Sequence, residues 1–359
     1  MRKFLHKILF VANIIVATAL LFSYLAPIVN PSVFILPAFF GLAYPYLLVL
    51  NILFIILWAS FIKWEVIISI VAILAGFSHF TNFVRFKKQD SSAEGTFKVL
   101  SYNVRLFNAY EKNNNDTESK ILEYIKEQEA DIVCLQEMFS NNERGVEGNR
   151  VLSSTGNRYY SHTKFIGSDN RRFYGIGTYS KYKIVNRGDI YHPNSSSLTI
   201  FSDIVIDQDT FRIFNNHLQS FKLKNMERSF IEEVMSLDER ESRNEVKELS
   251  SSLRNGFLRR SAQADIVKEA VNNSPYPVIV LGDFNDTPIS YTYHKLRKGL
   301  NDSFVESGYG AGFTYKGVYP TNRIDFILFS DKLDCKYFEV LKVKYSDHYP
   351  VFSNFTITE

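Results

Sequence analysis

Cysteine is nearly absent from this chain, which has only Cys134 and Cys335 in 359 residues. Two cysteines can build neither a disulfide framework nor a cysteine-rich zinc site. Cys134 lies in an apolar stretch, where it is most simply a small buried residue. The fold must therefore be held together by its hydrophobic core, and a metal in this protein would have to use other ligands.

Charge is also absent from a long part of the chain, since no charged residue occurs between Ile8 and Ile62. A membrane-spanning helix needs about 20 apolar residues, so this region is too long for one span. A signal peptide is the alternative, but the apolar sequence continues far beyond the apolar part of a signal. We expect three spans, at about Ile8–Leu25, Val33–Phe61 and Val66–Phe83.

Strong basicity is missing from the rest of the chain. Residues 1–90 contain seven basic and two acidic residues, and the whole chain has a net charge of +3, so residues 91–359 carry about −2. This balance argues mildly against avid, sequence-independent binding of nucleic acid.

The basic residues around the spans predict the orientation of a multi-pass membrane protein. Arg2, Lys3, Lys7 and Lys63 would lie inside the cytoplasm if the N-terminus does, whereas the three basic residues at 85, 87 and 88 favour the opposite orientation. Four basic residues favour an N-terminus inside the cytoplasm and three oppose it, so we expect the C-terminal domain to lie outside the cytoplasm. No protein partner can be inferred.

The remaining sequence predicts one domain rich in strands. We assign residues 1–88 to the membrane region, 89–96 to a polar linker and 97–359 to the domain. Leu223–Asn272 predicts one or two amphipathic helices. Many strands with few helices indicate an α+β sandwich of two packed sheets with helices outside. The expected strands are Phe97–Asn103, Ile132–Glu137, Gly175–Ser180, Thr199–Ile206, Phe211–His217, Val278–Leu281, Arg323–Phe329 and Val351–Thr356.

One strand ends in polar residues that suit phosphate chemistry. The apolar run Val278–Leu281 is followed by Gly282, Asp283 and Asn285. Asp283 and Asn285 are two residues apart, so on extended backbone their side chains point to the same side. An Asn- and Asp-rich turn is the alternative interpretation.

Further polar residues end the other expected strands. Taken singly, each could be a turn former, a solvent-facing acid, a core histidine or part of a surface loop. Together, acids, amides and histidines without cysteine indicate a site for a hard metal ion and a phosphate, with Mg²⁺ preferred and Mn²⁺ as the alternative. These residues are Asn103, Glu137, His217, Asp347 and His348.

The ordered motifs resemble those of the endonuclease/exonuclease/phosphatase superfamily, with its DNase I-like fold, including membrane-anchored bacterial members. The resemblance covers about residues 97–356 and implies a four-layer α/β/β/α sandwich of mostly antiparallel sheets. The N-terminal spans lie outside it. The motifs are Ser101-Tyr102-Asn103, Leu135-Gln136-Glu137, Gly175–Lys181, Asn216-His217-Leu218, Gly282-Asp283-Phe284-Asn285, Arg323-Ile324-Asp325-Phe326 and Ser346-Asp347-His348.

The resemblance also implies a role for each residue. Glu137 would be the main metal ligand, with Asn103 and Asp347 beside it. Asp325 would hold the ring of His348 in one tautomer. Asn285 and His217 would donate hydrogen bonds to the phosphate, where such donors matter most. Asp283 would position the attacking water, and either Asp283 or His348 would be the general base.

The sequence therefore predicts a membrane-anchored, Mg²⁺-dependent phosphoesterase that cleaves a phosphodiester or phosphomonoester by direct attack of water. A nuclease acting on DNA or RNA and a sphingomyelinase-like lipid phosphodiesterase are both compatible with these motifs. A non-catalytic membrane binding module is a more distant alternative, because such a protein would be expected to have lost one of the key residues.

Overall fold

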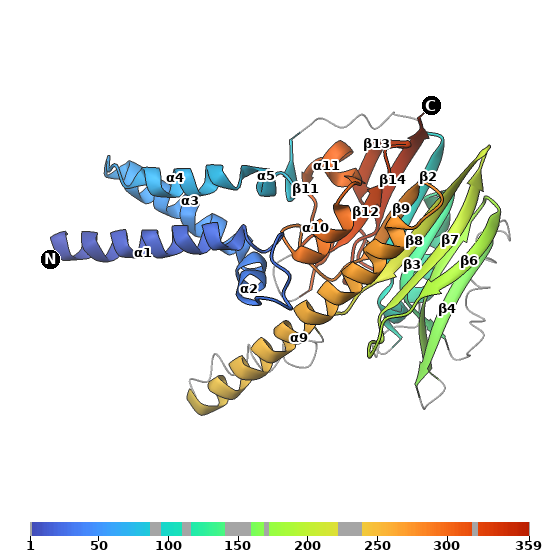
Figure 1. Cartoon of the computed structure of the whole chain (residues 1–359), viewed down its shortest axis with the longest axis horizontal. Coiled ribbons are helices and arrows are strands. Elements are labelled where there is room, and N and C mark those ends of the chain that lie inside the picture. The colour runs from blue at the N-terminus through green and yellow to red at the C-terminus, as the bar shows by residue number, and fades with distance from the viewer. Residues whose placement is uncertain are drawn as a thin grey trace.

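The structure is a computed structural model that describes residues 2–86, 95–109, 116–140, 159–168, 172–221, 239–317 and 322–358. Most of the linker expected at 89–96 and the first part of the helical region expected at 223–272 lie outside these residues. Figure 1 shows a two-sheet body with a group of helices projecting from one end.

Two mixed six-stranded sheets form the body, in the orders β10-β12-β9-β8-β7-β6 and β13-β14-β2-β3-β5-β4. Neighbouring strands are antiparallel except for the pairs β2–β3 and β8–β9, which are parallel. The eight expected strands are present. They correspond to β2 (Phe97–Asn103), β3 (Ile132–Ser140), β5 (Arg172–Ser180), β7 (Leu198–Ile206), β8 (Asp209–His217), β9 (Val278–Asp283), β12 (Asp325–Phe329) and β14 (Val351–Ile357).

Several further strands were not expected from the sequence. Their side chains do not form an uninterrupted apolar run, because these strands lie at or near sheet edges, where one or both faces meet water. They are β4 (Tyr160–Ser168), β6 (Ile184–Ile190) and β13 (Leu333–Val340), with the short β1 (Val84–Arg85), β10 (Asn301–Asp302) and β11 (Gly310–Ala311).

Alternating side chains build the layers of the body. On β9, Ile279 and Leu281 enter the core between the two sheets, whereas Val278 and Val280 face the helices on the other side. This is the period of two that an extended strand imposes. α6 (Thr117–Glu127) covers the second sheet, and α9 (Glu239–Asn272) with α10 (Tyr291–Arg297) covers the first. The expected α+β arrangement of two packed sheets between helices is thus present, with mixed sheets.

α9 is the element that the sequence placed between His217 and Asp283. It is one helix of 34 residues in the described part of the chain, which corresponds to about 50 Å at 1.5 Å per residue. Its C-terminal half packs on the sheet through Ala264, Val267 and Val271. Figure 1 shows that its N-terminal half extends beyond the body, below the projecting helices.

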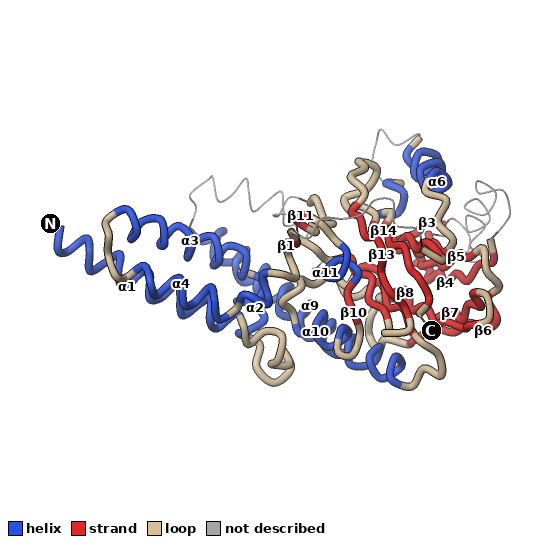
Figure 2. Tube along the Cα trace, turned by 90° about the horizontal axis from the view of Figure 1, so that it is seen from above, coloured by secondary structure: helices blue, strands red, loops and turns tan. Residues whose placement is uncertain are grey.

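The projecting group consists of α1 (Arg2–Ser23), α2 (Leu36–Leu42), α3 (Tyr44–Ser60), α4 (Val66–Ala75) and the short α5 (Phe77–Phe80). In Figure 2 the helices α1, α3 and α4 run side by side away from the sheets. Asn13 of α1 joins them, because its Nδ2 donates to Ser69 Oγ at 2.7 Å and its Oδ1 accepts from Trp58 Nε1 at 2.9 Å.

The helices differ from the three expected spans. The third expected span is broken at Gly76, so α4 has ten residues, well below the roughly 20 needed to cross a bilayer. The second is divided into α2 and α3, which are bent by 65°. By length and composition, one described helix, Lys3–Ser23, could cross a membrane, or two if the bent pair is one span. A signal sequence near an N-terminus passes the same test.

The helical group is attached to the body at several points. β1, which follows α5 closely, pairs with β11, and Ile289 of the body packs among Leu20, Tyr44 and Phe83 of the helices. Arg297 Nη1 also donates to Asn82 Oδ1 at 2.8 Å. These contacts place the helices beside the loop that follows β9.

Candidate active site

The expected site residues lie at one edge of the sandwich. The parallel pairs β2–β3 and β8–β9 both end there, and the register places His217 directly opposite Asp283. On the other side of β9, Asp325 also lies opposite Asp283. All three share the strand face that points between the sheets, because each is an even number of residues from a core residue of its strand. The pairing of β8, β9 and β12 thus brings these three residues into one cluster.

Glu137 reaches the site through an irregularity in β3. Val133 and Leu135, which are even numbers of residues away, face the outer helix α6, so a regular strand would point Glu137 away from the site. The pairing of β3 with β5 shifts register between Leu135 and Met138, and Glu137 has a φ of 50°. A bulge of this kind re-aims a side chain, and here Glu137 Oε1 lies 3.2 Å from Asn103 Nδ2.

The turn after β9 also depends on unusual backbone angles. Gly282 has a φ of 119°, and a Cβ at this position would lie 2.1 Å from the carbonyl oxygen of Asn216. Only glycine fits there, because it lacks a Cβ and adopts positive φ without strain. Asn285 has a φ of 53°, which asparagine tolerates better than most residues. The turn brings the Asn285 side chain back beside Asp283.

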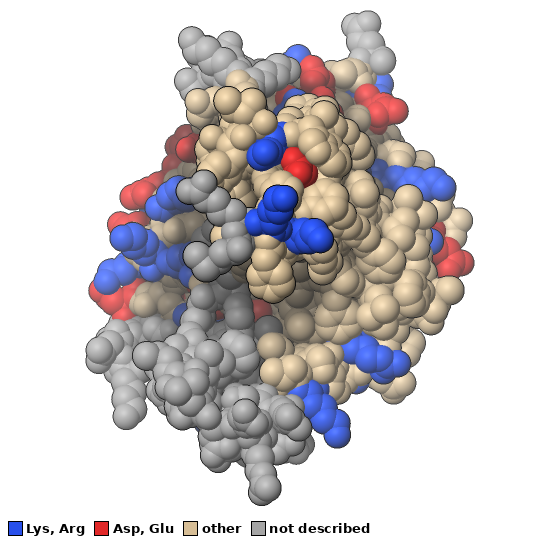
Figure 3. Space-filling model, turned by 90° about the vertical axis from the view of Figure 1, so that its left-hand side faces the viewer, with Lys and Arg blue, Asp and Glu red and all other residues tan. Residues whose placement is uncertain are grey.

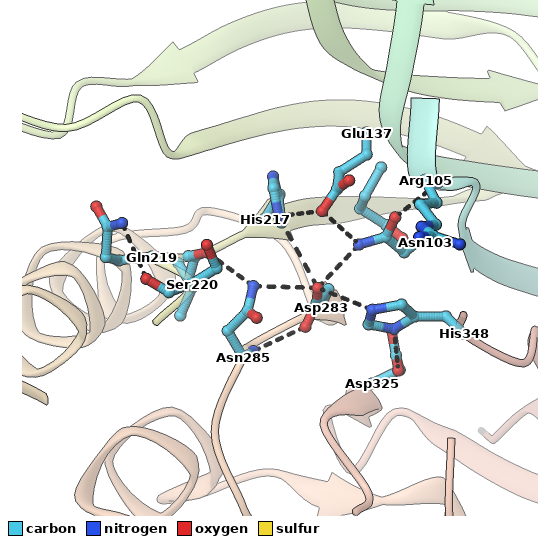
Figure 4. A network of polar contacts seen from close by, with 12 residues as sticks. Asn103, Arg105, Glu137, His217, Gln219, Ser220, Asp283, Asn285, Asp325 and His348 are labelled. Atoms are coloured by element: carbon cyan, nitrogen blue, oxygen red, sulfur yellow. Dashed lines mark hydrogen bonds and ion pairs between the residues drawn. The ribbon is translucent and has the colours of Figure 1, made fainter. Parts of the chain in front are cut away.

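Asp283 is the centre of the network drawn in Figure 4. Its Oδ2 accepts from Asn103 Nδ2 at 2.9 Å and from Asn285 Nδ2 at 3.1 Å, and its Oδ1 accepts from the Asn285 backbone N–H at 2.8 Å. The Nε2 atoms of His217 and His348 lie 3.9 and 3.8 Å from Oδ2. A nearly fully buried carboxylate is thus held by donors on both sides.

His348 is fixed by a carboxylate on the far side of its ring. Its Nδ1 lies 2.9 Å from Asp325 Oδ2, which leaves Nε2 facing Asp283. Burial disfavours the charged ring, but the carboxylates of Asp325 and Asp283 outweigh it and raise the pKa of His348 to about 10. The raised pKa favours the protonated ring, which can donate a hydrogen bond from Nε2.

Burial has the opposite consequence for Asp283. Loss of solvent raises the pKa of Asp283 to about 6, although His348 and His217 act to lower it. A carboxylate with a pKa close to the working pH is suited to general-base work. For His217, whose Nε2 lies 3.3 Å from Glu137 Oε1, burial is outweighed by Glu137, which raises the pKa of the ring above its usual value.

The donor atoms fit a divalent metal ion. The ligand atoms of Glu137, His217 and Asp283 all lie within 4.8 Å of one another, and those of Asp283, Asp325 and His348 form a second such group. Carboxylate oxygens are the ligands that Mg²⁺ and Mn²⁺ prefer, whereas an imidazole nitrogen is more typical of zinc, copper, iron and nickel sites. The residues present therefore fit the hard metal ion that the sequence predicts.

Asp347 lies at the margin of this cluster. Its Oδ2 is 3.2 Å from Arg105 Nε, and it belongs to neither of the two ligand groups formed by the described residues. The structure thus brings together Asn103, Glu137, His217, Asp283, Asn285, Asp325 and His348, and sets Asp347 against Arg105.

Two supporting features were not predicted from the sequence. Behind the site, Gln136 Nε2 donates to Asn215 Oδ1 at 2.7 Å, which joins the two sheets by a buried amide pair. On α9, the fully buried Arg260 donates from Nε to Asp286 Oδ2 at 3.0 Å and from Nη1 to the Gln219 carbonyl at 2.8 Å. Arg260 thus connects the loop after His217 to the turn after Asp283. One arginine in a charged helix gives no sequence signal of such a role.

A model of the endonuclease/exonuclease/phosphatase family matches residues 100–348. The chain belongs to this family. A second model, described only as a domain of unknown function, matches residues 6–83. A search of curated proteins gave no match.

Several solved structures are similar to the chain. A family member from Bacteroides thetaiotaomicron has 18% identity and a TM-score of 0.54, covering 73% of this chain and 98% of its own. A mannosyl-6-phosphatase from the same species has 19% identity and a TM-score of 0.51, covering 73% and 100%. The human Nocturnin catalytic domain with bound sulfate has 19% identity and a TM-score of 0.52, covering 73% and 93%. At these identities the likeness shows the fold alone.

Proposed function

We propose that this protein is a metal-dependent phosphoesterase that hydrolyses a phosphate ester by direct attack of water. The observation that carries the proposal is the position of Asp283, which belongs both to the group with Glu137 and His217 and to the group with Asp325 and His348. One group suits a metal ion and the other supplies a charged donor. The similarity to a mannosyl-6-phosphatase, which acts on a phosphate ester by its name, agrees with this reaction class.

In this proposal Glu137 would be the main ligand of Mg²⁺, or Mn²⁺, with the side-chain oxygen of Asn103 beside it. His217 would stay a hydrogen-bond donor, because Glu137 raises the pKa of its ring. When bound, the ion would neutralise charge on the phosphoryl oxygens. Asn103 is held between Glu137 and Asp283 and keeps the two carboxylates in place. Asp347, paired with Arg105, would act on the ion only from a distance.

Asp283 would be the general base. It is the site carboxylate whose pKa is raised to about 6, so at neutral pH it is mostly ionised and still basic enough to accept a proton from water. Three hydrogen bonds fix its position, so the attacking water would be oriented without reorganisation of the site. The raised pKa and the three hydrogen bonds support Asp283 over His348 as the base in this proposal.

His348 would donate to the phosphate as an imidazolium. Asp325 holds its Nδ1 at 2.9 Å, which leaves the Nε2 proton free to stabilise the negative charge that develops in the transition state. Asn285 and His217, on the other side of Asp283, would provide further donors. No group is placed as a nucleophile, so we propose no covalent intermediate.

Membrane attachment is the second part of the proposal. Large apolar side chains on the projecting helices are exposed, including Ile15 of α1 at 62%, Ile56 of α3 at 60% and Leu74 of α4 at 64%. Figure 3 looks onto this end of the molecule, where a small group of basic side chains and an acidic one lies amid a larger uncharged surface. A soluble protein rarely exposes so large an apolar surface, so we propose that these helices lie in a lipid bilayer, with the catalytic domain outside the cytoplasm.

Substrate hydrolysis by the purified full-length chain in detergent tests the reaction class. We would compare bis-p-nitrophenyl phosphate, p-nitrophenyl phosphate, single-stranded DNA, RNA, sphingomyelin and a mannose phosphate with Mg²⁺ or EDTA. Hydrolysis of at least one ester with Mg²⁺ or Mn²⁺ and its loss in EDTA would support the proposal. Full activity in EDTA would contradict the metal site, and inactivity on every ester would favour a non-catalytic binding module.

A further inference from the structure

Basic side chains gather beside the candidate site, although the catalytic domain as a whole is slightly acidic. We refer to them as the cationic rim, and they come from the turn after β2, from the loop after β11 and from the segment between β13 and β14. Aromatic rings of Tyr315 and Tyr349 lie among them. The members of the cationic rim are Arg105, Lys316, Lys342 and Lys344.

Arg105 is presented by an unusual turn. The segment Arg105–Asn108 has φ values of 49°, 54°, 53° and 54°, so four consecutive residues other than glycine adopt the left-handed conformation. Such a turn persists only where its surroundings hold it. Here the Arg105 N–H donates to Asn103 Oδ1 at 3.0 Å, Phe107 is buried, and Asn108 Nδ2 donates to the Tyr345 carbonyl at 2.8 Å. The result is a guanidinium held at the edge of the site.

The lysines are brought to the same place by backbone pairing. The Lys316 N–H donates to the Asp347 carbonyl at 2.9 Å, and the residue before it, Tyr315, pairs with His348. Lys316 Nζ lies 5.4 Å from the ring centroid of Tyr349, and Lys342 Nζ lies 4.4 Å from it. These are distances at which an aromatic face attracts an ammonium group. The Tyr349 ring therefore lies close to both lysines, and Lys342 Nζ also donates to the Phe313 carbonyl at 2.9 Å.

Burial acts on the two lysines that lie beside Tyr349, and neighbouring charges act on one of them. Burial lowers the pKa of Lys316 below its usual value. Asp347 acts to raise it, and the positive charges of Lys344 and Arg105 act more weakly to lower it. Burial likewise lowers the pKa of Lys342. Like charges held together at a cost in free energy gain most when an anion binds among them.

The cationic rim is continuous with the catalytic cluster. Arg105 is two residues after Asn103, and Tyr315 lies ring to ring with His348 at 5.1 Å between centroids. Two residues span at most about 7 Å of chain. An anionic group on the rim and a phosphate at Asp283 could therefore belong to one small molecule or to adjacent units of one strand.

We propose that the cationic rim is a second phosphate-binding subsite, and that the preferred substrate carries a further phosphate group beside the ester that is cleaved. This inference rests on the proposed function. Arg105 offers the planar fork of donors that matches a phosphate, and the lysines add point charges. Asp347 holds Arg105 at the edge of the site, so it has a positioning role at the rim.

Matched pairs of substrates test the inference. One pair is the p-nitrophenyl ester of thymidine 5′-phosphate with and without a 3′-phosphate. The other is glycerophosphoinositol with and without an additional phosphate on the ring. For each pair the ratio of kcat/KM values measures the contribution of the second phosphate, and the two pairs distinguish a nucleotide source from a sugar headgroup source.

The full-length enzyme should prefer the doubly phosphorylated member of at least one pair by about tenfold or more, as expected for a charge-assisted contact. Lys344→Ala and Lys316→Ala should reduce this ratio several-fold, mainly through KM, and NaCl should reduce it as well because it screens exposed charges. Lys183→Ala is the matched control. Lys183 is exposed, and its carbonyl accepts from the backbone N–H of Val205, near one end of β7. The residue of β7 that pairs with His217 is Leu198, at the opposite end of that strand.

The possible results distinguish a failure of the proposed phosphate subsite from a failure of the proposed phosphoesterase function. Hydrolysis of both members of both pairs at equal rates would contradict the subsite and leave the proposed function standing. An unchanged ratio in Lys344→Ala and Lys316→Ala, or an equal change in the Lys183→Ala control, would also contradict it. Absence of hydrolysis of every substrate, with the fold intact by circular dichroism, would contradict the proposed function itself.

Discussion

Asp283 and His348 have opposite protonation requirements, and their surroundings satisfy both. Burial raises the pKa of Asp283 to about 6, and the carboxylates around His348 raise its pKa to about 10. Asp283 must lose its proton to act as a base, whereas His348 must keep its proton to act as a donor. Between these two values both groups are in the form that the proposed reaction needs.

The pH profile of kcat/KM should therefore rise as the pH increases through about 6 and fall as it approaches about 10. Asp325→Asn should move the alkaline limb to lower pH, because Asp325 is the first of the charges that favour the imidazolium. The measurement is hydrolysis by the wild type and this variant across the range. An alkaline limb at the same pH in both proteins would contradict the proposed role of the His348–Asp325 pair.

A second residue-scale prediction concerns Gly282. Gly282→Ala should destabilise the fold, because the new Cβ would lie 2.1 Å from the Asn216 carbonyl oxygen at a φ of 119°. Gly299→Ala is a matched control, since Gly299 also has a positive φ, 73°, but nothing lies within 4 Å of its Cβ position. Positive φ alone costs about 1–2 kcal/mol for a residue other than glycine.

Urea unfolding of both variants would measure the difference in the free energy of unfolding. We expect the loss for Gly282→Ala to exceed the loss for Gly299→Ala, with activity reduced only in the former. Equal losses would show that the short distance between position 282 and the Asn216 carbonyl oxygen does not contribute to the loss of stability.

At the scale of elements, α9 connects three parts of the molecule. Phe257 packs edge to face on Phe39 of the helical group at 5.2 Å. One turn along α9, Arg260 stacks on Phe221 at 3.9 Å and donates to Asp286. A single helix thus contacts the projecting helices, the loop after His217 and the turn after Asp283.

Arg260→Met should destabilise the protein by about 3–5 kcal/mol, because it leaves the buried carboxylate of Asp286 without its partner. The double variant Arg260→Met with Asp286→Leu should recover part of this loss. Thermal or urea unfolding of the three proteins measures both effects. If the double variant is less stable than Arg260→Met alone, the Arg260–Asp286 pair is not the source of the loss.

The elements also show which parts of the fold the sequence could predict. β9 was predicted because an uninterrupted apolar run marks a strand buried on both faces. β6 and β13 were missed, since one face of each meets water and their apolar residues are too few. Glu137 was assigned to the site from its place at a strand end and from the motif that contains it. Strand periodicity alone would point it outward, and the bulge that re-aims it has no local signal.

On the scale of the whole molecule, the helical group and the catalytic body are joined close to the site. Ile289, which packs among the helices, is four residues from Asn285, and such a segment spans at most about 14 Å. β1 joins β11 within a few residues of Tyr315, which contacts His348. If the helices lie in a bilayer, the site is near its surface. The relative placement of the two parts depends on contacts between distant residues, which neither composition nor periodicity could reveal.

Membrane association is the prediction that belongs to this scale. The full-length protein should remain in the membrane pellet after washing with alkaline carbonate and should be released by detergent, because the exposed apolar helices would lose their lipid contacts in water. Release by carbonate without detergent, with retention of the N-terminal segment, would contradict integral insertion. Labelling of cysteines introduced at exposed positions such as Lys183 and Lys3 would report the side of the membrane.

The most direct test of the proposed mechanism is the Mg²⁺-dependent kcat/KM of wild type and Asp283→Asn on bis-p-nitrophenyl phosphate. Asparagine keeps the size of Asp283 but cannot accept a proton, so the variant should fold normally and lose about 10²–10⁴-fold in rate, the usual contribution of a general base. A rate within a few-fold of wild type at saturating Mg²⁺ would contradict the assignment of Asp283 as the centre of the active site.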